Sequence, residues 1–169
     1  MGYVEDTLGS GNTIEYDVLF HWLWTFSAYT IFVILVAAAL GLFLLFSPMT
    51  SVEAIEPMIR LLPSLVLAVF GLVIFLYMMI KKWTTERVLT DIRFIQKIGW
   101  IVRHTEEIRI DRMEEVNLDQ SLLGRILDYG DIKISGVGAG EIKLTMIDSP
   151  IDFQKKLNDL KAKFSAPTP

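Results

Sequence analysis

The chain has 169 residues, no cysteine and a formal net charge of −4. The lack of cysteine excludes disulfides, thiolate catalysis and cysteine-ligated zinc. Residues 1–17 contribute −4 to the charge, whereas residues 81–169 carry 15 basic and 14 acidic side chains. A nearly neutral region of mixed charge excludes nucleic-acid binding by bulk electrostatics, so we expect no nucleic-acid partner.

Two uncharged, apolar stretches predict a pair of membrane-spanning helices. No charged residue occurs in residues 18–52 or in residues 61–80. Each stretch contains the roughly 20 apolar residues that cross a hydrocarbon core about 30 Å thick, and a helix is needed there to pair the backbone amides. A soluble chain of this size could not bury two helices that are apolar all round. We therefore expect a transmembrane hairpin over residues 18–82, with spans at about 20–46 and 61–80 and an outer loop at 47–60.

The residues that flank the spans predict the topology. Lys81, Lys82 and Arg87 follow the second span, whereas the connecting loop has a single basic residue, Arg60. By the positive-inside rule the loop is outside and both termini are cytoplasmic. Tryptophans near this membrane face suit the interface, and the expected lipid-headgroup contacts are Trp22, Trp24, Lys81, Lys82, Trp83 and Arg87. The basic cluster could equally serve only to set the topology.

Small residues inside the spans predict where the two helices pack. Ala37 and Gly41 are four residues apart in the first span, as are Ser64 and Ala68 in the second. Such pairs allow close backbone approach, so we expect the helices to meet there. The spans contain no Asp, Glu, Lys or Arg that could form an ion path or proton relay, which argues against a transporter.

The N-terminal segment, residues 1–17, is predicted to be a cytoplasmic arm. The turn-forming run Gly9–Asn12 lies between two short stretches with β-branched and aromatic residues. This pattern predicts a small hairpin or extended arm just under the membrane. A partly ordered tail is the alternative.

After Trp83 the apolar period changes from helical to two. Alternation is typical of half-buried antiparallel strands, and it occurs in residues 87–90, 93–97, 108–111, 116–119, 132–134 and 142–146. Residues 121–128 break the pattern and predict a turn or a single helical turn. Ser149 and Pro150 begin a predicted helix. Its apolar stripe consists of Phe153, Leu157, Leu160 and Phe164.

Two stretches of the C-terminal half carry a family resemblance. Residues 86–99 (ERVLTDIRFIQKIG) and 110–130 (IDRMEEVNLDQSLLGRILDYG) resemble the bacterial PH-like domain family once called membrane-flanked domains. An Ile-Lys-Ile strand and a Pro-Ile-Asp-Phe helix start extend the resemblance over roughly residues 84–160. Family members often carry a transmembrane hairpin directly before the domain. The resemblance implies a split β-barrel capped by a C-terminal helix, here over residues 83–164 with a tail at 165–169, and it implies no reaction.

No group of residues predicts catalysis or a cofactor. Gly136–Gly140 is rich in glycine, but a strand follows it rather than the helix that a phosphate cradle needs, which indicates a hairpin turn. His21 and His104 lack metal-ligand spacing. Adjacent carboxylates at 106–107 and 114–115 point to opposite faces of their strands, so neither pair converges on a substrate atom. We expect a non-enzymatic protein without cofactor or metal.

A loop between two of the predicted strands allows two interpretations. As a structural loop, Gly124 and Gly130 would occupy positive-φ turn positions. Arg125 would then bridge to Asp119 or Asp128. As an interaction site, the same loop would contact a ligand or partner. The residues concerned in both cases are Gln120, Gly124, Arg125, Tyr129 and Gly130.

The sequence and the resemblance therefore predict an α+β membrane protein of the inner membrane of a bacterium or archaeon. In it, a two-helix hairpin holds a PH-like domain at the cytoplasmic surface. We expect it to act as a scaffold or accessory subunit of a membrane protein assembly, because mixed surface charge suits a specific protein partner. The partner would be another membrane protein or a second copy of the chain. Recognition of anionic lipid headgroups is the alternative function.

Overall fold

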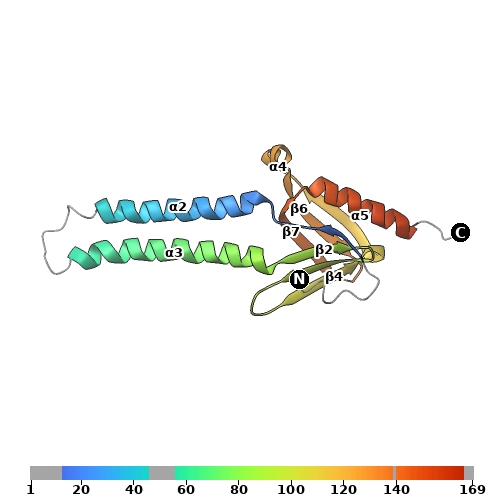
Figure 1. The fold of residues 1–169 in the computed structure, drawn as a ribbon, viewed down its shortest axis with the longest axis horizontal. Helices are drawn as coiled ribbons and strands as arrows, with labels where there is room; N and C mark the ends of the chain where they lie inside the picture. The colour runs from blue at the N-terminus through green and yellow to red at the C-terminus, as the bar shows by residue number, and fades with distance from the viewer. Residues whose placement is uncertain (1–12, 46–55, 139, 166–169) are drawn as a thin grey trace. The chain divides into compact units, whose positions relative to one another are not determined.

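A computed structural model describes residues 13–45, 56–138 and 140–165 (Figure 1). The chain forms two compact units. One unit is Leu23–Ile80, which holds the long helices, and the other combines Met1–Trp22 with Lys81–Pro169. The second unit is therefore built from both ends of the chain, and the helical unit is an insertion within it.

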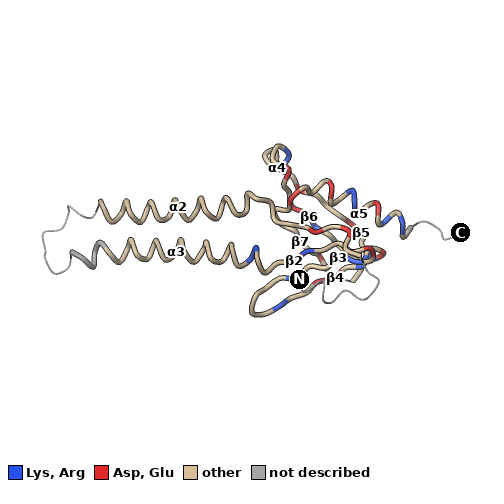
Figure 2. Tube along the Cα trace, in the orientation of Figure 1, with Lys and Arg blue, Asp and Glu red and all other residues tan. Residues whose placement is uncertain are grey.

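Two long helices, α2 (Trp22–Leu45) and α3 (Glu56–Thr84), make up the helical unit. Both are long and apolar enough to cross a membrane. A core helix of a soluble protein would be mostly buried. In contrast, only 11% of the apolar 18-residue segment that marks each helix as a candidate span is buried. No charged residue occurs in α2 or in α3 between Leu61 and Ile80, and Figure 2 shows the lysines near the end of α3.

Helix α3 begins earlier than the uncharged stretch that predicted it. It starts at Glu56 rather than Leu61, so Pro63 lies inside the helix and not in its first turn. Charge ends a hydrocarbon-compatible stretch, but a helix can continue through charged residues because its backbone pairs internally. Sequence composition thus predicted the span and not the helix boundary.

The two long helices pack through one glycine and a set of aromatic rings. A Cβ built on Gly71 would lie 3.0 Å from the Cβ of Leu35, so the helices approach closely there. The ring of Phe75 makes tilted contacts with those of Tyr29 and Phe32, with centroids 5.1 and 5.2 Å away. Gly71 lies three residues from Ala68 and Leu35 lies two residues from Ala37, so this contact is within about one turn of the predicted small-residue pairs.

The predicted small-residue contact is not the one that the structure shows. Ala37 is exposed, and a Cβ built on Gly41 would have no heavy atom within 4 Å. Ser64 and Ala68 are half-buried, and the Ser64 hydroxyl donates a hydrogen bond to the Leu61 carbonyl of its own helix. Small residues are frequent in apolar helices, so spacing alone could not select the contacting glycine.

Replacing the contacting glycine should separate the helices. Gly71→Leu is expected to destabilise their packing by about 1–3 kcal/mol, the usual cost of overpacking a close contact. Gly41→Leu is the matched control and should leave the packing unchanged, since its side chain would enter open space. The midpoint of thermal loss of helical circular dichroism, measured on the full chain in detergent, compares the two. Equal midpoints would contradict the observed packing.

Within the described residues, seven strands form two antiparallel sheets. The four-stranded sheet has the order β1 (Ile14–Asp17), β2 (Glu86–Thr90), β3 (Arg93–Ile98) and β4 (His104–Arg109). The three-stranded sheet has the order β5 (Met113–Asp119), β6 (Tyr129–Gly136) and β7 (Gly140–Asp148). The remaining elements are η1 (Ile110–Arg112) between the sheets, α4 (Leu122–Leu127) between β5 and β6, and α5 (Pro150–Ser165) after β7. The predicted antiparallel strands, the helical turn and the C-terminal helix are confirmed.

The described end of the N-terminal segment contributes a strand to this domain. Strand β1 pairs antiparallel with β2, with Tyr16 opposite Leu89 and Asp17 opposite Val88. Val18 continues the pairing, since its amide donates to the Arg87 carbonyl at 2.9 Å. The chain thus begins the sheet, leaves it through the two long helices and returns as the neighbouring strand. The predicted turn at residues 9–12 lies outside the described residues.

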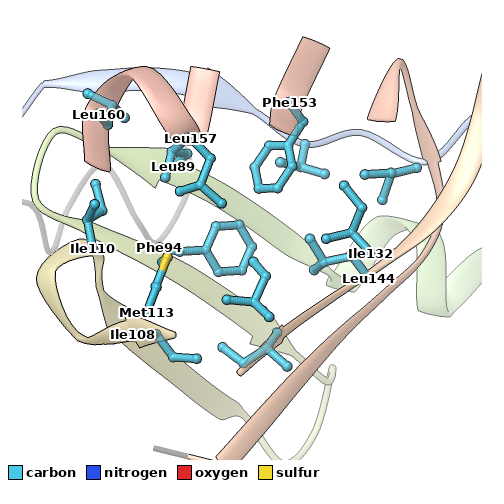
Figure 3. Close-up of a cluster of buried hydrophobic side chains, with 14 residues drawn as sticks. Leu89, Phe94, Ile108, Ile110, Met113, Ile132, Leu144, Phe153, Leu157 and Leu160 are labelled. Atoms are coloured by element: carbon cyan, nitrogen blue, oxygen red, sulfur yellow. The ribbon is translucent and has the colours of Figure 1, made fainter. Parts of the chain in front are cut away.

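The core of the domain lies between the two sheets and α5 (Figure 3). Phe153 of α5 meets Phe94 of β3 edge to face, with ring centroids 5.9 Å apart. Leu157 and Leu160 are buried beside it, as the apolar stripe predicted, whereas Phe164 is exposed in the last turn of α5. Tyr16 packs on Phe153 at 5.8 Å, so β1 and α5 share this core.

Candidate functional site

A pocket of about 370 Å³ lies where the N-terminal segment meets the start of β2. Its lining residues are Ile14, Asp17, Val18, Leu19, Phe20, Lys82, Thr85, Glu86, Arg87 and Val88. Two of the charged side chains are acidic and two are basic, so the lining favours neither an anion nor a cation. The apolar part of the lining comes mostly from the N-terminal segment.

Arg87 was predicted to contact lipid headgroups, but the structure buries it. The residue is 4% exposed, because strand alternation places its side chain on the same face of β2 as the core residue Leu89. Its guanidinium lies 4.2 Å from the centroid of the Phe20 ring, and Nη1 donates to the Thr145 carbonyl at 3.4 Å. Burial lowers the pKa of Arg87 to about 10, against the opposing effect of Asp131. Arg87 therefore joins the N-terminal segment to β2 and β7 and is not a surface cation.

The other predicted headgroup contacts lie at the ends of the long helices. Trp22 and Trp83 are exposed, and Lys81 and Lys82 are half-buried. Trp24 is half-buried, and its indole N–H donates to the Met78 carbonyl at 3.1 Å. The two exposed indoles and the two lysines keep the composition of an interfacial belt.

The loop between β5 and β6 is organised by the side chain of Gln120. Its amide Nε2 donates to the carbonyls of Gly124 at 3.0 Å and Tyr129 at 3.1 Å, which ties α4 to the start of β6. Ser121 caps α4 by accepting a hydrogen bond from the Gly124 amide at 3.0 Å. Asp128 ends the helix with φ of 57°. These contacts support the structural interpretation of the loop.

The two loop glycines are required for close approach and not for positive φ. Neither Gly124 nor Gly130 has a positive φ, so that expectation was wrong. A Cβ on Gly124 would lie 2.6 Å from the Tyr129 carbonyl oxygen, and one on Gly130 would lie 3.2 Å from the Asp119 carbonyl oxygen. Arg125 is exposed on α4. Its predicted partner Asp119 instead pairs with Lys133 at 3.2 Å.

A methyl group at position 124 should strain this loop. Gly124→Ala is expected to lower the free energy of unfolding by about 1–3 kcal/mol, because the backbone carbonyl of Tyr129 must move to admit it. Arg125→Ala, at an exposed position of the same helix, should change it by no more than about 0.5 kcal/mol. Denaturant unfolding of the full chain in detergent measures both. A Gly124→Ala variant as stable as Arg125→Ala would contradict the close approach.

Two exposed apolar clusters were not recognised in the sequence. One is the tip of the β3–β4 hairpin, where Trp100, Ile101 and Val102 are 67%, 86% and 80% exposed. The other is the outer face of α4, where Leu122, Leu123 and Ile126 are 76%, 62% and 71% exposed. Each was visible as an apolar run next to a glycine, but strand and helix patterns do not distinguish a buried apolar residue from an exposed one.

The described residues contain no group of three His, Asp or Glu side chains placed to hold a metal ion. A second, open pocket of about 410 Å³ lies under the α4 loop. It is lined by Asp119, Gln120, Ser121, Tyr129, Gly130 and Asp131. Gln120 is engaged in the loop hydrogen bonds, as is the Tyr129 carbonyl, so part of this lining has a structural role.

A family model described as bacterial PH domain matches residues 18–161. The match extends over both long helices, the strands from β2 onwards and most of α5. The chain belongs to the bacterial PH domain family. The resemblance drawn from residues 86–99 and 110–130 is thereby confirmed, and the bacterial PH domain here includes the two-helix insertion. No curated protein and no solved structure matches the chain.

Proposed function

We propose that this bacterial PH domain is a membrane-anchored, non-enzymatic interaction module. Helices α2 and α3 cross the cytoplasmic membrane of a bacterium or archaeon as a hairpin, and the domain lies on the cytoplasmic side as a split barrel capped by α5. The observation that carries the proposal is the insertion of two span-like helices between the adjacent strands β1 and β2. A domain attached at two neighbouring points has little freedom to leave the membrane surface, which suits a stationary contact with another membrane protein or a second copy.

The charges of the domain support a protein partner over a lipid. Figure 2 shows basic and acidic residues interspersed along the strands and α5. Many of them pair, as in Arg93–Glu107 at 2.9 Å and Lys156–Glu15 at 2.8 Å. Surfaces of mixed charge set partner choice and register through complementarity. Headgroup recognition, the alternative, loses one of its expected cations because Arg87 is buried.

Purification of the full chain tests the two functions. A tagged chain extracted in mild detergent is analysed by native mass spectrometry, beside a Lys81→Gln/Lys82→Gln variant. The interaction module predicts a stoichiometric protein partner or a second copy, bound equally by the variant. A monomer accompanied only by anionic lipid, and losing that lipid in the variant, would favour headgroup recognition instead.

A further inference from the structure

We propose that the domain inserts two further elements into the bilayer that α2 and α3 cross. They are the tip of the β3–β4 hairpin (Trp100, Ile101 and Val102) and the outer face of α4 (Leu122, Leu123 and Ile126). Both would place apolar side chains at the boundary between headgroups and acyl chains. The inference rests on the proposed membrane insertion of α2 and α3 and adds a second, peripheral contact to it.

Strand register places the hairpin tip at the end of the sheet where the chain enters from α3. Strand β2 begins at Glu86, directly after the end of α3, and Glu86 pairs with Lys97 near the end of β3. Ile98 pairs with His104 of β4, so residues 99–103 form the turn beyond this level. The tip therefore extends past the first residue of β2, at the end of the sheet where β2 begins.

Helix α4 lies where the chain leaves the domain into α2. Tyr129, which follows α4, pairs with Asp148 at the end of β7. The Asp148 amide donates to the Leu19 carbonyl at 3.1 Å, and the ring of His21 lies 5.5 Å from the ring of Tyr129. Residues 19–21 immediately precede Trp22, the first residue of α2. The β3–β4 hairpin tip belongs to the four-stranded sheet, and α4 connects two strands of the three-stranded sheet. Both thus lie at the end of the domain that connects to the two long helices.

The chemistry of both elements matches a lipid surface. Large apolar side chains at this exposure are unfavourable in water, and clusters of them mark contact surfaces. Tryptophan prefers the membrane interface, and leucine and isoleucine reach the acyl boundary on short amphipathic elements. No acidic residue occurs in residues 98–103 or 122–127, whereas Arg103 and Arg125 provide a cation in each. Continuity with the two spans makes the bilayer, rather than a separate partner, the surface that covers both.

Single cysteines can test this directly, since the chain has none of its own. Ile101→Cys and Ile126→Cys are labelled with an environment-sensitive fluorophore on the full chain in nanodiscs of phosphatidylethanolamine and phosphatidylglycerol. Val137→Cys is the matched control, because it is an exposed apolar position (59%) in the β6–β7 turn, at the other end of those strands. Leu40→Cys, in α2, reports on the span itself. Quenching by lipids spin-labelled at shallow or deep positions reads out depth.

We expect shallow-lipid quenching and a blue-shifted emission at positions 101 and 126, no quenching at 137, and quenching by lipid labels at 40. Quenching at 40 with positions 101 and 126 as unquenched as 137 would overturn the inference while leaving the membrane hairpin intact. Blue-shifted emission at 101 or 126 without lipid quenching would also overturn it, since a protein contact would then cover the element. No quenching at 40 would instead contradict the membrane hairpin of the proposed function.

Discussion

A fragment of residues 81–169, produced without the N-terminal strand, should show no cooperative unfolding transition. The fragment lacks Val18, which is buried in the core, and Tyr16, which packs on Phe153. Full burial of a side chain of this size stabilises by about 1.5–3 kcal/mol, so the buried Val18 contributes about that much and the partly buried Tyr16 adds a smaller amount. Whole domains are stable by only about 5–15 kcal/mol, and the exposed edge of β2 would add to the loss.

The control restores the strand without the membrane helices. Residues 23–80 are replaced by a flexible Gly/Ser linker of about ten residues, which joins Trp22 to Lys81. This chain should unfold cooperatively in urea, as followed by near-ultraviolet circular dichroism. Identical cooperative transitions for the fragment and the linked chain would contradict the role of β1 in the core.

The second large effect is expected at the centre of α5. Leu157→Ala should lower the free energy of unfolding by about 2–4 kcal/mol, because Leu157 is fully buried between the sheets and its loss leaves a cavity. Ile151→Ala, on the same helix at an exposed position, should change it by no more than about 0.5 kcal/mol. Denaturant unfolding of the linked chain measures both variants. Equal stabilities would mean that α5 does not cap the core.

Local patterns predicted the elements whose signal is contained in a few consecutive residues. The uncharged stretches predicted two span-like helices, alternation predicted the strands from β2 onwards, and the stripe of α5 predicted three of its four apolar positions correctly. The pairing of β1 with β2 was not predicted, because β1 has only four residues and its partner lies beyond the helical insertion. Pairing across such a distance leaves no local periodicity.

Three site predictions failed because a residue type has more than one use. Arg87 looked like a surface cation, but its place in the alternation of β2 directs it inwards, against Phe20. Gly124 looked like a turn glycine, whereas it is small to admit the Tyr129 carbonyl. Gly41 looked like a helix contact, whereas Gly71 makes it. In each case the deciding neighbour comes from elsewhere in the fold.

In the proposed arrangement, one bacterial PH domain on the cytoplasmic side carries a two-span hairpin between β1 and β2. Labelling of single cysteines in intact cells with a membrane-impermeant maleimide tests it most directly. Ser51→Cys, in the outer loop that the sequence predicts, should be labelled in intact cells, and Val137→Cys, at an exposed position between β6 and β7, only after permeabilisation. Labelling of Val137→Cys in intact cells, or protection of Ser51→Cys until permeabilisation, would contradict it.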